Sequence, residues 1–373
     1  MRAQSASTSR SGQLVRRAER IFAGRLSLPP PRYRRYALPA AATLVRARWA
    51  GLVRRAPVMS VEEHAAATGV GEIEEVIGCS LCGERRVRAL FHVRPGRSAR
   101  YHVVLCARCG FLYRHPGIRP ERLGELYGSG RYGTYLRGHY SAYRRRRYRL
   151  VMNAFWPLFQ RGHGRRLLDF GSGTGLFLEL AHRRGFEGYG VDLAEDAVAY
   201  ARTRPGGARS FCGSPRDVPE IAAGGFHVIT LWSVLAHLAT PVEDLTMLRS
   251  LLTHDGALLI LTVNANSLDL KAQRARWGGF TPNHLKFFAP STLCRLLERA
   301  GFGAVVFSPM LPDHVAAGKA RLTRGQLRRM RRNVEKRNEG NMLRAVAFVD
   351  RDGPGRWAMR DRAVTLDDRH HAD

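Results

Sequence analysis

An apolar run leads directly into three closely spaced glycines at Leu167-Leu168-Asp169-Phe170-Gly171-Ser172-Gly173-Thr174-Gly175. The apolar residues predict a short buried strand, and the residues from Leu176 onward have the spacing of a helix. A strand, a glycine turn and a helix in this order are typical of an open α/β sheet, in which ligands bind at the carboxyl ends of the strands. Glycines at such a turn remove side chains that would keep a ligand away from the backbone.

The acidic residues around this turn favour a cationic ligand. Dinucleotide-binding turns have the spacing GxGxxG and place pyrophosphate on the helix N-terminus, whereas this turn reads GxGxG and follows Asp169. A carboxylate there repels pyrophosphate and suits a ligand that carries an ammonium and a sulfonium. Asp192 ends the next predicted strand, where a carboxylate can accept hydrogen bonds from both hydroxyls of a ribose. Dinucleotide folds also have an acid at that place, so only the combination with Asp169 discriminates.

Predicted strands and helices alternate after Arg165. Buried strands are expected at residues 167–170, 188–193, 226–232, 257–263, 304–307 and 343–349, and helices at 176–184, 197–202, 242–252 and 291–300. Gly185 is expected to end the first helix, and Ser291 and Gly301 to cap and end the last. Repeated β–α units predict an α/β fold, a doubly wound Rossmann-like sheet of parallel strands with helices on both faces.

These motifs resemble those of the class I S-adenosylmethionine-dependent methyltransferase family, over about residues 127–349. The resemblance implies S-adenosylmethionine as the cofactor. Asp169 and the glycines Gly171, Gly173 and Gly175 would hold its methionine end, Asp192 its ribose, and Leu193 would flank its adenine. The alternative is a GxGxG turn in an unrelated α/β protein.

Weaker matches follow further along the chain. Residues 212–219 resemble the loop that contacts adenine, with Ser214 where the family often has Asp, so Asp217 or backbone groups are the alternatives. His227 replaces the usual Asp of the fourth strand, and Ala236 replaces the Glu of the family's VLEHL segment. These departures concern adenine recognition and activity more than cofactor binding.

Two histidines are candidates for a general base. His237 ends the segment after the fourth strand, and His284 lies in Thr281-Pro-Asn-His-Leu-Lys-Phe-Phe288, which resembles a substrate-side segment of the family. Either could deprotonate an acceptor hydroxyl, amine or carbon acid. Each could equally be structural, because methyl transfer depends mainly on the alignment of the reacting atoms.

Four of the six cysteines form two CxxC pairs, Cys79/Cys82 and Cys106/Cys109, each followed by a glycine. Two such pairs can supply four thiolates to a structural zinc ion, which leaves no open position for catalysis. A redox pair is the lesser alternative. Cys212 and Cys294 are expected in the core.

The cysteine pairs resemble a subgroup of class I methyltransferases with an N-terminal zinc ribbon. That resemblance implies an acceptor among sugars, polysaccharides or secondary metabolites. The tyrosines after the second pair, Tyr127, Tyr132 and Tyr135, also resemble the subgroup; they could cover the cofactor or pack the ribbon on the large domain.

Five regions are expected along the chain: a basic extension at 1–58, disordered or preceding a true start at Met59; a zinc ribbon at 74–116; a Tyr- and Arg-rich helical lid or linker at 120–160; a cofactor-binding domain at 161–350; and a disordered tail at 351–373. No apolar run approaches the about 20 residues of a membrane-spanning helix, and no signal peptide is visible, so a cytoplasmic protein is expected.

The net charge of +30 leaves alternatives to a small-molecule or glycan methyltransferase. Basic residues gather in 1–58 and in 319–337, so a zinc-ribbon RNA methyltransferase is the second hypothesis. Arg-rich usage also follows from GC-rich coding without any polyanionic partner. A degenerate, non-catalytic binding module is the third hypothesis, and the intact Asp169, Asp192 and glycines argue against it.

Overall fold

The structure is a computed structural model that describes residues 39–94, 101–127, 145, 148–149, 166–310 and 336–349. Several predicted features fall wholly or largely outside these residues: the extension before residue 39, most of the basic segment 319–337, the tail from residue 350, and the lid at 120–160 beyond residue 127, apart from residues 145, 148 and 149. Among the described residues, no helix has both the length and the apolar character needed to cross a membrane.

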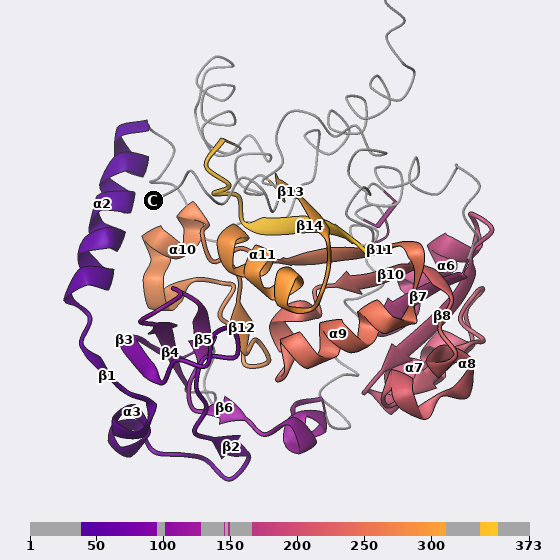
Figure 1. The fold of residues 1–373 in the computed structure, drawn as a ribbon, viewed down its shortest axis with the longest axis horizontal. Helices are drawn as coiled ribbons and strands as arrows, with labels where there is room; N and C mark the ends of the chain where they lie inside the picture. The colour runs from indigo at the N-terminus through magenta and orange to yellow at the C-terminus, as the bar shows by residue number, and fades with distance from the viewer. Residues whose placement is uncertain are drawn as a thin grey trace, which may run out of the picture.

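A seven-stranded sheet in the order β13-β14-β11-β10-β7-β8-β9 forms the centre of the molecule (Figure 1). Its strands are β7 (Arg166–Phe170), β8 (Glu187–Asp192), β9 (Ser210–Cys212), β10 (Phe226–Trp232), β11 (Leu252–Val263), β13 (Ala304–Met310) and β14 (Met342–Phe348). The predicted α/β sheet is confirmed, but the expectation that all of its strands are parallel is wrong. β14 runs antiparallel to both neighbours, β11 and β13. Its apolar run could not reveal this direction, because interior strands of either direction are buried on both faces.

The predicted helices are confirmed as α6 (Leu176–His182), α7 (Glu195–Arg202), α9 (Pro241–Leu251) and α11 (Pro290–Arg299), joined by the shorter α8 (Pro219–Ala222) and α10 (Leu268–Gln273). The predicted cap of α11 is wrong. Ala289 is the N-cap residue, and Thr292 Oγ1 accepts the Ala289 N–H at 2.9 Å. Ser291 lies inside the first turn because Pro290, which needs no hydrogen-bonding partner for its nitrogen, begins the helix.

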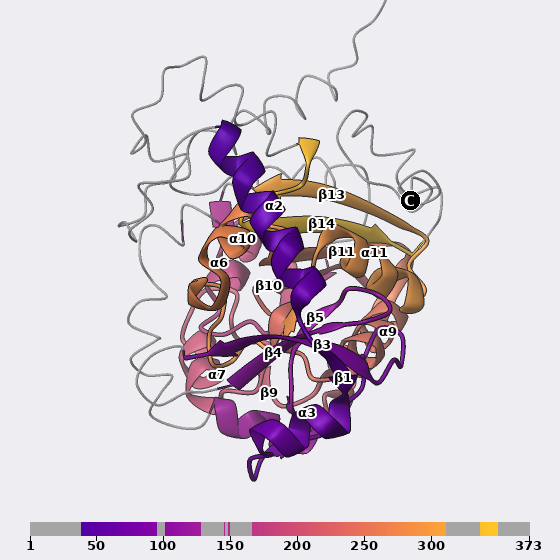
Figure 2. The same ribbon diagram turned by 90° about the vertical axis from the view of Figure 1, so that its left-hand side faces the viewer.

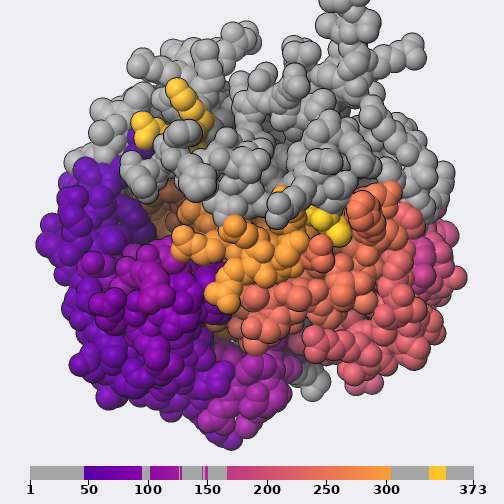
Figure 3. Space-filling model, viewed as in Figure 1, coloured from indigo at the N-terminus to yellow at the C-terminus, as the bar shows by residue number. Residues whose placement is uncertain are grey.

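Alternate residues along each strand enter two separate cores on opposite faces of the sheet. Leu168, Ile229 and Leu258 pack with α9 and α11, whereas Leu167, Val228 and Leu259 pack with α6. The first core also contains residues of the cysteine-rich N-terminal region, such as Val87 and Phe111. The N-terminal part of the chain is therefore packed into the same interior as the large domain, and Figure 3 shows the two parts abutting directly.

A second sheet, β1-β3-β4-β5-β12, joins the two parts of the chain. The strands β1 (Val58–Ser60), β3 (Arg86–Val93), β4 (Tyr101–Cys106) and β5 (Leu112–Arg114) belong to the N-terminal region, but β12 (Lys286–Phe287) comes from the large domain. The helix α3 (Val61–Thr68), the paired strands β2 (Glu74–Glu75) and β6 (Gly117–Ile118), and the 3-10 helix η1 (Pro120–Leu126) complete this region, here called the cysteine module (residues 58–127). It is larger than the predicted 74–116 unit.

The prediction that residues 1–58 lack structure is wrong from Pro39 onward, because Pro39–Arg55 form the helix α2. This helix runs along one side of the molecule, beside α10 (Figure 2). The guanidinium of Arg46 pairs with the buried carboxylate of Glu339, which also accepts a hydrogen bond from Lys271 Nζ at 2.8 Å. Trp49 lies 6.0 Å from Phe91, measured between ring centres. These partners are distant in the sequence, so the Arg-rich composition alone gave no sign of them.

Candidate functional site

The glycine turn lies between β7 and α6, and its three glycines have different surroundings. All three have positive φ angles, which favour glycine over other residues. A Cβ atom on Gly171 would lie 2.3 Å from Val234 Cγ2, and one on Gly175 would lie 3.0 Å from Ala201 Cβ. A Cβ atom on Gly173 would meet nothing within 4 Å. Gly171 and Gly175 are therefore packed against the protein, whereas Gly173 borders open space in which a ligand can approach the backbone.

Asp192 ties the end of β8 to this turn. Its Oδ2 accepts the Gly173 N–H at 2.7 Å, and its Oδ1 accepts the Ala194 N–H at 3.0 Å. Burial raises the pKa of Asp192, and these backbone hydrogen bonds oppose the rise. The structure thus places the two sequence motifs, the glycines and Asp192, in direct contact.

Asp169 is buried at the end of β7, with 2% of its surface exposed. Its Oδ1 accepts a hydrogen bond from Thr230 Oγ1 at 2.6 Å, a partner on β10 that the sequence did not reveal. Burial raises the pKa of Asp169 to about 7, although the hydrogen bond from Thr230 acts in the other direction. A cation bound beside this carboxylate would favour its ionised form.

The loop expected to contact adenine lies beside Asp192, because Asp192 pairs with Cys212 in neighbouring strands. Leu193 is 46% exposed, which is unusual for a leucine directly after a buried strand and leaves its side chain free for a ligand. Ser214 Oγ accepts the Arg216 N–H at 3.3 Å, and Asp217 is exposed. The prediction that Cys212 is a core residue is wrong, because it is exposed at the edge strand β9; Cys294 is buried as predicted.

His237 and His284 lie together, with ring centres 4.8 Å apart. His237 belongs to the 3-10 helix η3 (Leu235–His237), which follows β10, and Val234 just before it packs on Gly171. Tyr127, at the end of the cysteine module, hydrogen-bonds through its Oη to His237 Nδ1 at 2.7 Å. The group of Tyr127, His237 and His284 therefore adjoins the glycine turn. Its tyrosine comes from the cysteine module and its two histidines come from the large domain.

The two histidines differ in their surroundings. His284 Nδ1 lies 2.6 Å from the carbonyl oxygen of Gly279. Since a carbonyl only accepts hydrogen bonds, Nδ1 of His284 carries the proton and Nε2 is left with the lone pair. Burial lowers the pKa of His237 to about 3 and also lowers that of His284. Both rings are neutral near pH 7, and His284 is the better placed of the two to accept a proton.

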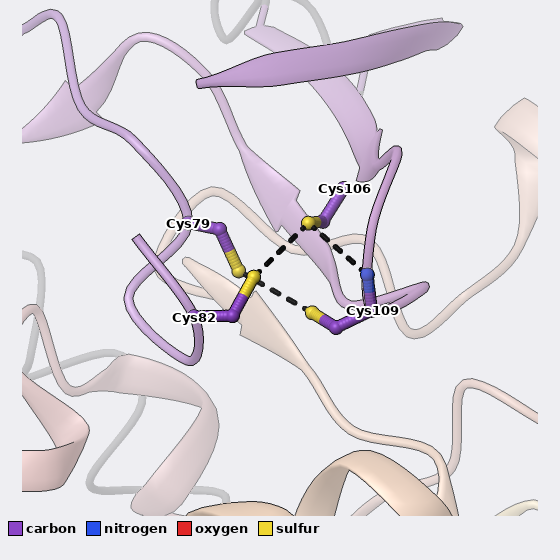
Figure 4. A group of neighbouring side chains, drawn as sticks. All are labelled: Cys79, Cys82, Cys106 and Cys109. Carbon is purple, nitrogen blue, oxygen red and sulfur yellow. Dashed lines mark hydrogen bonds between the residues drawn. The ribbon is translucent and has the colours of Figure 1, made fainter. Parts of the chain in front are cut away.

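The four predicted metal-ligand cysteines converge, with their sulfur atoms all within 4.8 Å of one another (Figure 4). Cys79 and Cys109 are 3.5 Å apart at Sγ, and so are Cys82 and Cys106. In each knuckle the N–H of the following glycine, Gly83 or Gly110, donates to the carbonyl of the first cysteine. Both glycines have φ near +70°, as these tight turns require.

The donor set of this cluster fits a divalent, thiophilic metal ion. Four converging thiolates are the ligand set of structural zinc sites. Hydrogen bonds from Cys109 and Cys79 lower the pKa of the Cys106 thiol. The sequence did not single out Lys286, which is 2% exposed and has its ammonium 5.6 Å from the centre of the Tyr113 ring. Burial lowers the pKa of Lys286 to about 8, while the charge on Cys79 opposes this change.

The chain matches a known protein family over its large domain. Residues 140–305, less than half of the chain, match the model of a methyltransferase domain family. Ubiquinone biosynthesis O-methyltransferases of Cereibacter sphaeroides and a Ruegeria species are 31% and 32% identical to it over 162 and 163 residues. These alignments cover 39% and 40% of this chain and 66% of each relative, so the chain spans slightly less than two thirds of the relatives' length.

Solved structures of similar proteins include a SAM dependent methyltransferase from Archaeoglobus fulgidus. It is 21% identical, with a TM-score of 0.44, over 58% of this chain and 98% of that protein. Another is the magnesium protoporphyrin IX methyltransferase of Synechocystis, 14% identical, with a TM-score of 0.42, over 61% of this chain and 99% of that protein. The family match agrees with the glycine turn and its two acidic residues: residues 140–305 are similar to a methyltransferase domain.

Proposed function

We propose that this protein transfers a methyl group from S-adenosylmethionine to a hydroxyl group of a small molecule or glycan. The observation that carries the proposal is the open space at Gly173, whose N–H donates to the carboxylate of Asp192 and which lies in the turn that follows the buried Asp169. Two acidic groups beside a stretch of backbone that no side chain covers suit a ligand with an ammonium at one end and a ribose at the other.

The residues of this site fit each part of the cofactor. Asp169, with its raised pKa, would gain a cationic partner in the amino group of the methionine end. Asp192 would hold the ribose hydroxyls, and the exposed side chain of Leu193 would lie against the adenine. Ser214 and Asp217 lie on the adjoining loop and are proposed adenine-side contacts. When bound, S-adenosylmethionine supplies a methyl group made electrophilic by its sulfonium.

His284 is proposed as the general base. Its Nδ1 proton is engaged by Gly279, so Nε2 can take the proton of an acceptor hydroxyl. His237, whose pKa is lowered to about 3 by burial, is proposed to orient the acceptor together with Tyr127. A hydroxyl acceptor is supported by the relatives, which are named O-methyltransferases. The resemblance to zinc-ribbon methyltransferases supports a sugar as one source of that hydroxyl.

The four cysteines are proposed to hold a structural Zn²⁺ ion. All four positions around such an ion would be filled by Cys79, Cys82, Cys106 and Cys109, so the ion would stabilise the module without binding substrate.

Calorimetric titration of the full chain with S-adenosylhomocysteine tests the cofactor site. We expect binding by the parent protein and at least about tenfold weaker binding by Asp192→Asn, which loses a charge-assisted acceptor for the ribose. Asp255→Ala removes an exposed carboxylate on β11 and serves as the matched control. A folded, zinc-loaded parent protein that does not bind would refute the proposal and favour a non-catalytic module. If the parent protein binds, acceptors are assayed next by methyl transfer, with phenols and nucleotide sugars first.

A further inference from the structure

The segment that carries His284, Thr281 to Phe288, is held on one side by the cysteine module and on the other by its own domain. Tyr101 Oη donates a hydrogen bond to the carbonyl of Thr281 at 2.9 Å. Arg114 Nη1 donates to the carbonyl of Pro282 at 3.2 Å, and the Arg114 N–H donates to the carbonyl of Leu285 at 2.8 Å. Three successive parts of the segment are therefore bound to side chains or backbone of the module.

Arg114 is the centre of this contact. Its guanidinium is almost fully buried, pairs with the carboxylate of Glu74 and lies 5.1 Å from the centre of the Tyr101 ring. A buried arginine is costly unless its charge and its N–H groups have partners. Here Glu74 supplies the opposite charge, the ring supplies a cation–π contact, and the carbonyl of Pro282 accepts from Nη1, while the buried Nε–H has no partner among the described residues.

The strand pairing continues where these side-chain contacts end. Lys286 and Phe287 pair with Tyr113 and Leu112 as antiparallel neighbours in β12 and β5. On the opposite side, the Leu285 N–H donates to the carbonyl of Ala236 at 2.7 Å, next to His237. The segment therefore lies between the module and η3, and its position sets the contact between His284 and His237.

The cysteine knuckle lies at the other end of the same hairpin. Cys106 to Gly110 form the turn between β4 and β5, with the Cys106 N–H donating to the carbonyl of Phe111 at 2.8 Å. Tyr101 begins β4 and Arg114 ends β5, so both lie at the end remote from the knuckle. A hairpin pinned at its turn keeps these two residues in register.

We infer that the cysteine module is part of the acceptor side of the methyltransferase site, with Arg114 as the positioning residue that fixes the His284 segment. The inference rests on the proposed function for its meaning in catalysis, although the positioning itself can be measured without any ligand. A module with this role acts on the acceptor side and leaves cofactor binding unchanged.

Hydrogen–deuterium exchange of the full, metal-loaded chain tests the inference through Arg114→Lys and Tyr101→Phe. Lysine keeps the charge beside Glu74 but lacks the second arm, and phenylalanine keeps the ring but lacks the hydroxyl. We expect amide exchange in residues 281–288 to rise about fivefold to tenfold in each variant, the scale set by one hydrogen bond. Exchange in β8 and affinity for S-adenosylhomocysteine should stay within about twofold, a difference of less than one hydrogen bond.

Arg166→Lys is the matched control, because Arg166 also donates to a backbone carbonyl, that of Glu220, and lies over the rings of Tyr189 and Phe226. It should leave residues 281–288 unchanged. As a second readout, NMR titration of the His284 imidazole should show its pKa rising toward the ordinary value in Arg114→Lys, as water reaches the ring. Unchanged exchange in 281–288, or an equal rise in β8, would overturn the inference. Failure of the parent protein to bind S-adenosylhomocysteine would refute the proposed function and leave this result intact.

Discussion

Lowering the pH from 8 to 6 should weaken the binding of S-adenosylhomocysteine, because Asp169 takes up a proton in that range. Burial raises the pKa of this carboxyl from its usual 3.8 to about 7 in the unliganded protein. The ligand's ammonium is proposed to pair with the ionised carboxylate, so binding must first displace any proton on Asp169. The apparent affinity therefore follows the ionised fraction of this one group.

The size of the effect follows from that pKa. With a pKa of about 7, Asp169 is about 90% ionised at pH 8 and about 10% ionised at pH 6. The dissociation constant should therefore rise about tenfold, or about 1.4 kcal/mol in binding free energy.

The raised pKa of Asp169 also affects folding. A raised pKa in the folded state means that the unliganded protein loses stability as the pH rises from about 4 through 7, by at most about 4 kcal/mol.

Calorimetry at pH 6, 7 and 8 with Asp169→Asn as the control checks this reasoning. The variant should bind more weakly at pH 8 and show little dependence on pH, since it has no proton to displace. In thermal unfolding without ligand, the same variant should be more stable than the parent at pH 8 and more nearly equal at pH 5. An Asp169→Asn protein with the parent's pH dependence, or with the parent's affinity at pH 8, would refute the assignment.

Substitutions at three further places, the glycine turn, Glu339 and the cysteine cluster, test other parts of the structure. Gly171→Ala should lower the free energy of unfolding by about 1–3 kcal/mol, because the added Cβ collides with the side chain of Val234. Gly173→Ala should mainly weaken the binding of S-adenosylhomocysteine measured by calorimetry, because the added Cβ points into the open space. Glu339→Gln should cost about 3–5 kcal/mol in urea unfolding, because it leaves two basic partners without their buried carboxylate. Cys106→Ser should lose the bound zinc measured by a colorimetric chelator, while serine at the exposed Cys212 should retain it.

The central sheet could be predicted from the sequence because its strands are short apolar runs bounded by glycines and helices. The glycine turn and Asp192 could be placed together for the same reason, since both follow adjacent strands. The antiparallel direction of β14 could not be predicted. A strand that is buried on both faces lacks the alternation of apolar and polar residues that is typical of many antiparallel strands. The two residues of β12 are too few to show any period.

The remaining misses depend on contacts between distant residues. α2 looked disordered because its composition is rich in arginine, yet Arg46 has a buried partner in Glu339. The hydrogen bond from Thr230 to Asp169 and that between Tyr127 and His237 join residues far apart in the chain. A single sequence carries no signal for such pairs, although the tyrosine series after the cysteines marked the region where Tyr127 lies.

The two-residue strand β12 also limits which fragments of this chain can fold by themselves. The family match begins at residue 140, which suggests a fragment that omits the cysteine module. Yet Phe287, Phe280 and Trp277 form one apolar cluster with Phe91 and Leu112 of that module, and all five are at least nine-tenths buried. A fragment cut at the family boundary would expose an aromatic face to water and aggregate. The boundary of the family match is therefore not a boundary of folding, and transfer of the module to another domain would require a matching aromatic surface on that domain.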